Sequence, residues 1–194
     1  MPRIVAGQVG GRRLAVPPSG TRPTSDRARE ALFSSLESQL GGLAGRQVLD
    51  LYAGSGAVGL EAWSRGAALV VLVESASAAL KVLRANVASL RAAPHASAGK
   101  IEVVGAKVER AVTELSASGF DVVFADPPYD LPAAQLRGAL ATLATRETLR
   151  HGAVVVVERA SRERWTWPAG YRALHDRKYG DSTLHYAAAD SGSL

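Results

Sequence analysis

The chain has 194 residues, of which 47% are hydrophobic, carries a formal net charge of +5 and contains no cysteine. Its size suits one α/β domain with a single core, and the lack of cysteine excludes disulfides, thiolate metal sites and catalysis by a cysteine nucleophile. Because the N-terminus has no signal-peptide pattern and no apolar run approaches the roughly 20 residues of a membrane span, we expect a soluble cytoplasmic protein without membrane contact.

The first predicted element is a β-hairpin. Residues 3–8 and 12–16 are short runs on either side of a Gly-Gly dipeptide, which is typical of a tight turn. A stretch rich in proline and glycine follows them. We therefore predict a small N-terminal β-hairpin extension over residues 1–20 and a larger domain over residues 21–189.

Basic charge gathers at both ends of the chain. Residues 1–30 hold six arginines against two acidic side chains, and residues 159–194 again carry more basic than acidic groups, whereas the residues between them are close to neutral. A near-neutral body with basic flanks indicates a polyanion held by the flanks, such as a nucleic acid. A GC-rich genome would explain the preference for arginine over lysine, but it would not explain the clustering.

The rest of the chain predicts an α/β fold. Thr24 or Ser25 caps a helix whose apolar side chains repeat at helical spacing up to Gly41. Beyond it, short runs rich in β-branched residues alternate with helical segments, and runs that are apolar throughout belong to parallel strands covered on both faces. A closing antiparallel hairpin turns at Gly180-Asp181. The prediction is a doubly wound, Rossmann-like sheet with strands at residues 48–52, 69–73, 101–104, 122–125 and 153–157, and helices at residues 59–65, 76–92, 107–117 and 132–145.

A glycine-rich loop follows the first strand of this sheet. Gly54, Gly56 and Gly59 match G-x-G-x-x-G, and Glu74 comes 20 residues after Gly54, at the end of the second strand. Such glycines allow a tight turn in dinucleotide-binding proteins, where the acid binds ribose hydroxyls. Asp50, at the end of the strand before the loop, favours an ammonium group instead, which S-adenosylmethionine (SAM) has and a pyrophosphate lacks. A plain strand-to-helix turn is the alternative without a ligand.

The stretch Asp126-Pro127-Pro128-Tyr129 follows the fourth strand, so it should lie at the same carboxyl edge of the sheet as the glycine loop. The Asp126 carboxylate and the Pro127 carbonyl can accept hydrogen bonds from the exocyclic amine of a nucleobase, which points the lone pair of the amine at a methyl donor. The Tyr129 ring can stack on the base. The alternative is an ordinary proline-rich turn.

These motifs together resemble a known family. Residues 126–129 and the stretch VLDLYAGSGAVGLEA resemble the amino-methyltransferase signature of class I SAM-dependent enzymes. RIVAGQVGGRRL at residues 3–14 and RPTSDRAREALFSSL at residues 22–36 resemble the N-terminal pattern of the RsmD-type bacterial methyltransferases. The resemblance covers residues 3–186. It implies methylation of N2 of guanine 966 in a hairpin loop of 16S ribosomal RNA, within the assembled or assembling 30S subunit.

The resemblance also implies roles at matching positions. The glycine-loop backbone would hold the methionine part of SAM, Glu74 its ribose and the backbone near Ala106 its adenine, although Gly105 stands where relatives often have a polar residue. The arginines of the hairpin would hold RNA phosphates beside the cleft. We therefore assign catalysis to Asp126, Pro127, Pro128 and Tyr129; SAM binding to Asp50, Tyr52, Ala53, Gly54, Ser55, Gly56, Glu74, Ser75 and Ala106; and RNA binding to Arg3, Arg12, Arg13 and Arg22, with no metal site.

Several alternatives stay open. An adenine-N6 DNA methyltransferase would use the same acceptors, although the chain has no evident sequence-reading domain. A non-catalytic RNA-binding assembly factor and an NAD-linked oxidoreductase are less consistent with the motifs. Arg27 and Arg29 either line the outer wall of the SAM pocket or pair with nearby acids on a solvated face, and Glu158 either faces the cleft or forms a structural ion pair. We expect a monomer.

Overall fold

The computed structural model describes residues 2–17, 26–115 and 119–190. Three predictions fall outside these residues: Arg22 as an RNA contact, the cap at Thr24 or Ser25, and the last two residues, 116–117, of the helix predicted over residues 107–117. No helix in the described part of the chain is both long enough and apolar enough to cross a membrane.

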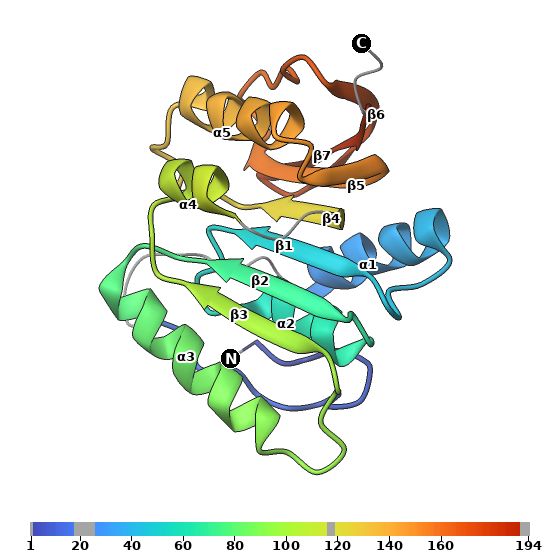
Figure 1. Cartoon of the computed structure of the whole chain (residues 1–194), viewed down its shortest axis with the longest axis vertical. Coiled ribbons are helices and arrows are strands. Elements are labelled where there is room, and N and C mark those ends of the chain that lie inside the picture. Colours follow the sequence, from blue (N-terminus) through green and yellow to red (C-terminus); the bar gives the residue numbers. More distant parts are fainter. Residues whose placement is uncertain (1, 18–25, 116–118, 191–194) are drawn as a thin grey trace.

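The described residues form a seven-stranded sheet in the order β3-β2-β1-β4-β5-β7-β6 (Figure 1). The first five strands are parallel, and β7 is antiparallel to both of its neighbours. This arrangement confirms the predicted doubly wound α/β fold. The strands are β1 (Gln47–Leu51), β2 (Leu69–Val73), β3 (Lys100–Val104), β4 (Phe120–Ala125), β5 (Leu149–Ala160), β6 (Tyr171–Tyr179) and β7 (Ser182–Ala189), and the helices are α1 (Asp26–Leu40), α2 (Ala57–Ser64), α3 (Ser77–Arg91), α4 (Val108–Glu114) and α5 (Ala133–Thr145).

The central strands are apolar throughout because both of their faces are covered. Alternate side chains point to opposite faces, so Val48 and Val70 join a core with α1, α2 and α3, whereas Leu49 and Val71 join a second core with α4 and α5. The sheet therefore lies between two helical layers. In a sheet of this kind, ligands bind outside the carboxyl ends of the parallel strands.

Strand β5 differs most from its predicted range. The prediction covered residues 153–157, where the side chains are apolar, but the strand runs from Leu149 to Ala160. Its last three residues pair with Ser182, Thr183 and Leu184 of β7. An antiparallel partner supplies backbone hydrogen bonds whatever the side chains are, so hydropathy alone does not mark this end of the strand.

The predicted N-terminal β-hairpin is wrong in its extent. The chain does fold back, with Arg3 opposite Arg13 and the Ile4 N–H donating to the Arg12 carbonyl over 2.8 Å. However, Arg3 and Arg13 form an isolated bridge rather than a two-stranded ladder, and the turn between them is wider than the predicted dipeptide. We call residues 2–17 the N-terminal arm.

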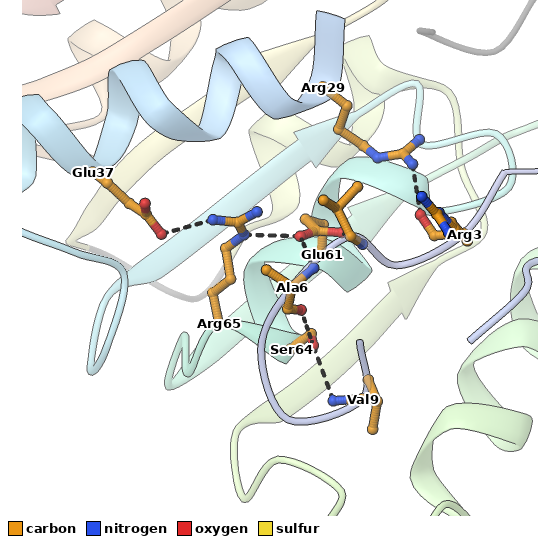
Figure 2. Close-up of polar contacts among 9 residues, drawn as sticks. Arg3, Ala6, Val9, Arg29, Glu37, Glu61, Ser64 and Arg65 are labelled. Atoms are coloured by element: carbon orange, nitrogen blue, oxygen red, sulfur yellow. Dashed lines mark hydrogen bonds and ion pairs between the residues drawn. The ribbon is translucent and has the colours of Figure 1, made fainter. Parts of the chain in front are cut away.

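Several backbone donors of the N-terminal arm bind helix α2 instead of a second strand (Figure 2). The N–H groups of Val5 and Ala6 donate to the buried Glu61 carboxylate over 2.6 and 2.9 Å, and the Val9 N–H donates to the Ser64 hydroxyl over 3.2 Å. Arg65 also donates to Glu61, over 2.8 Å. Because these groups already have partners on α2, a regular β-ladder does not form.

Apolar side chains complete the attachment of the N-terminal arm. Ile4, Val9 and Leu14 are each at most 3% exposed and belong to the core that contains α1, α2 and α3. The arginines next to them point outward, since Arg3, Arg12 and Arg13 are all exposed. The N-terminal arm is thus an integral part of the fold that displays basic side chains.

Candidate active site

A cavity of about 650 Å³ lies at the carboxyl edge of the sheet. We call it the carboxyl-edge cavity; its volume is in the range of sites that hold a small molecule. The carboxyl ends of β1, β2 and β4 meet here because these strands are parallel neighbours. Eight of the residues assigned from sequence line this cavity: Tyr52, Gly54, Glu74, Ser75, Asp126, Pro127, Pro128 and Tyr129.

The glycines of the loop after β1 have different physical roles. Gly54 has a φ of 56°, and a Cβ there would have no atom closer than 4.0 Å, so the backbone borders open space where a ligand can approach. Gly56 precedes α2 with a φ of 83°, and a Cβ there would lie 2.5 Å from Leu83. Gly59 lies against β2, where a Cβ would be 2.2 Å from Leu72. The motif therefore combines a ligand-facing glycine with two packing glycines.

Glu74 directly follows β2 and orders the loops around it. One carboxylate oxygen accepts the Gly54 N–H over 2.9 Å, and the other accepts the N–H groups of Ser75 and Ala76, each over 2.7 Å. Hydrogen bonds to a carboxylate are stronger than those between neutral groups. Glu74 therefore fixes the glycine loop relative to the start of α3 and remains on the cavity wall.

Asp50 lies beneath the glycine loop rather than on the cavity wall. It is 2% exposed and accepts the Gly59 N–H over 2.8 Å. Burial raises the pKa of Asp50 to about 7; the hydrogen bond from Gly59 lowers it in part, and the charge of Glu74 adds to the increase. The carboxyl group thus supports the first turn of α2 from below.

Tyr52 is a wall residue with an unusual backbone. The prediction placed Tyr52 in the first strand, but β1 ends at Leu51. Tyr52 itself has a φ of 63°, a conformation that is uncommon outside glycine. Such conformations concentrate at functional sites. Its hydroxyl is buried and has no hydrogen-bond partner within the described residues. Burial also raises the pKa of this hydroxyl above its usual range, with a further increase from the nearby Glu109 charge, so it stays protonated as a donor.

The corner after β4 presents an acid and an aromatic ring to the same cavity. Asp126 is half-buried, Pro127 is buried and Tyr129 is 58% exposed. Two hydrogen bonds brace the residues that follow, because the Leu131 N–H donates to the Pro128 carbonyl over 3.0 Å and Arg159 donates to the Leu131 carbonyl over 3.0 Å. Sequence reasoning did not identify Arg159. This buried arginine lies near the end of β5, next to β4, from where it can hold the residues after β4 in place.

Other assigned residues lie close to the carboxyl-edge cavity without lining it. Ala53, Ser55 and Gly56 belong to the glycine loop behind Gly54, and Ala106 lies just before the wall residues that follow β3. Those wall residues are Lys107, Val108 and Glu109, which sequence reasoning did not assign.

The interpretation of α1 as the outer wall of this cavity is not supported, because the described wall residues include none from α1. Arg29 is fully buried, so it does not lie on a solvated face either. It donates to the Arg3 carbonyl over 2.6 Å (Figure 2) and thereby fixes the start of the N-terminal arm. An arginine on an amphipathic helix gives no sequence signal for this role. Glu158 is half-buried and pairs in register with Leu184.

Asn86 joins the N-terminal arm to the glycine loop and was also missed. This α3 side chain is 5% exposed, accepts the Ala15 N–H over 2.9 Å and donates to the carbonyls of Ala15 and Ser55 over 3.0 and 2.9 Å. The arm continues to Pro17, which lines the carboxyl-edge cavity. The polar position on an otherwise apolar helix face is the only signal in the sequence.

The carboxyl-edge cavity is acidic. Its described wall carries the carboxylates of Glu74, Glu109, Asp126 and Asp130 against the single cation of Lys107. An excess of negative charge favours a cationic ligand and repels a phosphate or pyrophosphate. Of the two ligands considered for the glycine loop, this charge distribution favours SAM, which is cationic, over a dinucleotide, which carries a pyrophosphate.

The strand order, the glycine loop after β1 and the acidic residue that ends β2 define a class I methyltransferase fold. The chain belongs to the family described as Conserved hypothetical protein 95, whose model matches residues 2–188, and is therefore an RsmD-family methyltransferase, as its motifs predicted.

Named relatives agree with this family. Ribosomal RNA small subunit methyltransferase D of Escherichia coli K12 is 43% identical over 130 residues, which are 66% of this chain and 60% of that protein, so the match spans less than two thirds of that relative. The Haemophilus influenzae protein of the same name is 32% identical over 180 residues, or 92% of this chain and 89% of the relative. The solved structure of Escherichia coli yhhF has a TM-score of 0.82 at 31% identity, covering 98% of both chains.

Proposed function

We propose that this chain is a SAM-dependent methyltransferase that methylates N2 of a guanine in small-subunit ribosomal RNA, namely guanine 966 of 16S rRNA, within the assembled or assembling 30S subunit. The observation that carries the proposal is the carboxyl-edge cavity, where the glycine loop, Glu74 and residues 126–129 meet. The relatives that bear the name of a small-subunit rRNA methyltransferase support RNA over DNA as the substrate.

The wall of the cavity fits SAM. The excess of carboxylates suits a ligand with an ammonium and a sulfonium charge, and Gly54 leaves room for its close approach. Glu74 would bind the ribose hydroxyls, and the backbone around Lys107 the adenine. When bound, SAM supplies a methyl group that is electrophilic because its sulfur is positively charged.

The residues after β4 would prepare the guanine amine for attack. The lone pair of this amine is delocalised into the base, so hydrogen-bond acceptors must hold its N–H groups in the right orientation. The Asp126 carboxylate and the Pro127 carbonyl are such acceptors, and the carboxylate can take the proton that N2 loses. The exposed Tyr129 ring can stack on the guanine. Catalysis then depends mainly on orientation.

The N-terminal arm would position the RNA. Arg3, Arg12 and Arg13 are exposed and lie near one another across the fold-back, with Arg3 and Arg13 in direct register. Contacts from such arginines to phosphates bind RNA without reading its sequence. Because α2 holds the arm firmly, these charges keep a fixed position relative to the glycine loop at the start of α2.

The test compares Asp126→Ala with Asp130→Ala, which removes one carboxylate from the same cavity. Transfer of labelled methyl groups is measured on small subunits from a strain lacking the enzyme, and SAM binding is measured by calorimetry. Asp126→Ala should lower transfer by roughly 10²- to 10⁴-fold while SAM still binds, and Asp130→Ala should keep most activity. Full transfer by Asp126→Ala, or an equal loss in both variants, would contradict the assigned role.

The same assay separates the alternatives. Methylation of DNA but not RNA would indicate an adenine methyltransferase, and failure to bind SAM would indicate an assembly factor without catalysis. Mass spectrometry of the methylated RNA identifies the nucleotide and the modified nitrogen.

A further inference from the structure

A second cavity, of about 520 Å³, adjoins the carboxyl-edge cavity. We call it the side cavity. Tyr129 lines both cavities, so a ring already assigned to the target base forms their common wall. The remaining wall comes from the end of β5 with Arg162 just after it, from Lys178 near the end of β6, and from the β6–β7 turn with Asp181.

The sheet holds these two segments together. Ala160 pairs with Ser182 and Arg159 with Thr183, and the Ser161 N–H donates to the Asp181 carbonyl over 2.7 Å. Because β5 is parallel to β4, its carboxyl end lies at the same edge as residues 126–129. The side cavity is therefore a fixed continuation of the carboxyl-edge cavity.

The two cavities differ in charge. The described wall of the carboxyl-edge cavity has four carboxylates and one cation, whereas that of the side cavity has two cations, Arg162 and Lys178, and one carboxylate, Asp181. Within the described residues, neither Arg162 nor Lys178 forms an ion pair, and both are exposed. An RNA strand whose base enters the acidic cavity must leave its phosphates elsewhere, and these cations attract them.

The size and aromatic wall of the side cavity also suit a nucleotide. Its volume is in the range that holds a small ligand, and single-stranded RNA binds by stacking bases on aromatic rings beside basic side chains that contact the backbone. We propose that the side cavity binds the phosphodiester and the nucleotide adjacent to the methylated guanine, with Arg162 and Lys178 as phosphate ligands. This inference rests on the proposed function, since it assumes that the guanine enters at Tyr129.

The proposal gives the basic C-terminal region a task distinct from that of the N-terminal arm. The arm lies beside α2 and α3, whereas the β6–β7 hairpin forms the opposite end of the sheet (Figure 1). RNA would then be held on both sides of the carboxyl-edge cavity, which keeps the extruded base between two anchored stretches of backbone.

The test is the double variant Arg162→Glu/Lys178→Glu, matched by Lys100→Glu/Arg146→Glu. The control makes the same change of net charge at exposed residues at the opposite edge of the sheet, beside the amino ends of β3 and β5. Binding to small subunits from a strain lacking the enzyme is measured without SAM over a range of salt concentrations, and SAM affinity is measured separately. The side-cavity variant should bind RNA at least tenfold more weakly than the control, with unchanged SAM affinity.

The salt dependence gives a second readout. Loss of two phosphate contacts to single-stranded RNA should reduce the slope of log K against log salt by about 1.4. Equal weakening by both double variants, or binding of the side-cavity variant like wild type, would overturn the proposal. If SAM affinity also falls, the neutral variant Arg162→Gln/Lys178→Gln must reproduce the RNA defect alone, or the proposal is wrong.

These outcomes are distinct from failure of the proposed function. If wild type binds the subunits but does not methylate them, the proposed reaction fails, while the binding comparison still decides the role of the side cavity. If wild type does not bind the subunits, both proposals fail.

Discussion

Glu61→Gln should release the N-terminal arm while the rest of the domain stays folded. The fully buried Glu61 carboxylate accepts three hydrogen bonds, from Val5, Ala6 and Arg65. Glutamine has nearly the same volume but only one acceptor oxygen, and its NH₂ group would face a donor N–H. The negative charge opposite Arg65 is lost as well.

The magnitude follows from these contacts. A hydrogen bond to a charged group contributes about 1.5–3 kcal/mol, so losing one such bond and weakening the others should cost roughly 2–4 kcal/mol. A domain is stable by about 5–15 kcal/mol, so most molecules remain folded. If the cost appears as local opening, the exchange protection of the Val5 and Ala6 amides should fall at least about 30-fold, since 1.4 kcal/mol is a factor of ten.

Hydrogen exchange of residues 2–16, together with urea unfolding, measures both effects. Glu37→Gln is the matched control, because Glu37 binds the same Arg65 over 2.8 Å but is 44% exposed and does not touch the arm (Figure 2); it should change stability by less than about 1 kcal/mol. The reasoning is refuted if Glu61→Gln leaves the exchange of Val5 and Ala6 unchanged, or if both variants behave alike.

Three further predictions concern Asp50 and the glycine loop. The pKa of Asp50 is raised from 3.8 to about 7, so its stabilising contribution is complete below pH 3.8 and is lost as pH rises through 7. Relative to Asp50→Asn, the unfolding free energy of wild type should fall by up to about 4 kcal/mol over that interval, as measured by urea unfolding. Parallel plots of unfolding free energy against pH for the two proteins would contradict this prediction. Gly59→Ala should destabilise the protein by about 1–3 kcal/mol, because the new methyl group would lie 2.2 Å from Leu72. A Cβ at Gly54 would face open space, so the free energy of unfolding of Gly54→Ala should lie within about 1–2 kcal/mol of the wild-type value. The variant should nevertheless bind SAM several-fold more weakly, as measured by calorimetry. Unchanged SAM affinity would argue against a ligand-facing Gly54.

The sequence predicted the sheet and one edge of it well because those features depend on local patterns. Parallel strands such as Leu69–Val73 are apolar throughout, and motif residues follow their carboxyl ends. Glu74 and Asp126 could therefore be assigned to a common edge from sequence, and both line the carboxyl-edge cavity. The glycine spacing gave the loop for the same reason.

Residues that act across long separations could not be predicted. Glu61 and Asn86 bind backbone of the N-terminal arm from positions 56 and 71 residues away along the chain, and neither has a spacing that marks a partner. The extent of the predicted hairpin was wrong for the same reason, because the backbone N–H groups of Val5, Ala6 and Val9 bind α2, which sequence patterns do not place beside them. The left-handed backbone of Tyr52 is likewise set by the loop around it, since tyrosine itself does not favour it.

The burial of Ile4, Val9 and Leu14 has a consequence for how such enzymes diversify. A segment that contributes to the core in this way cannot be exchanged by itself. Replacing it with the N-terminal arm of another enzyme would require matching substitutions along α2, which binds the arm. Under the proposed function, RNA affinity is more easily altered at Arg3, Arg12 and Arg13, because these side chains are exposed rather than packed in that core.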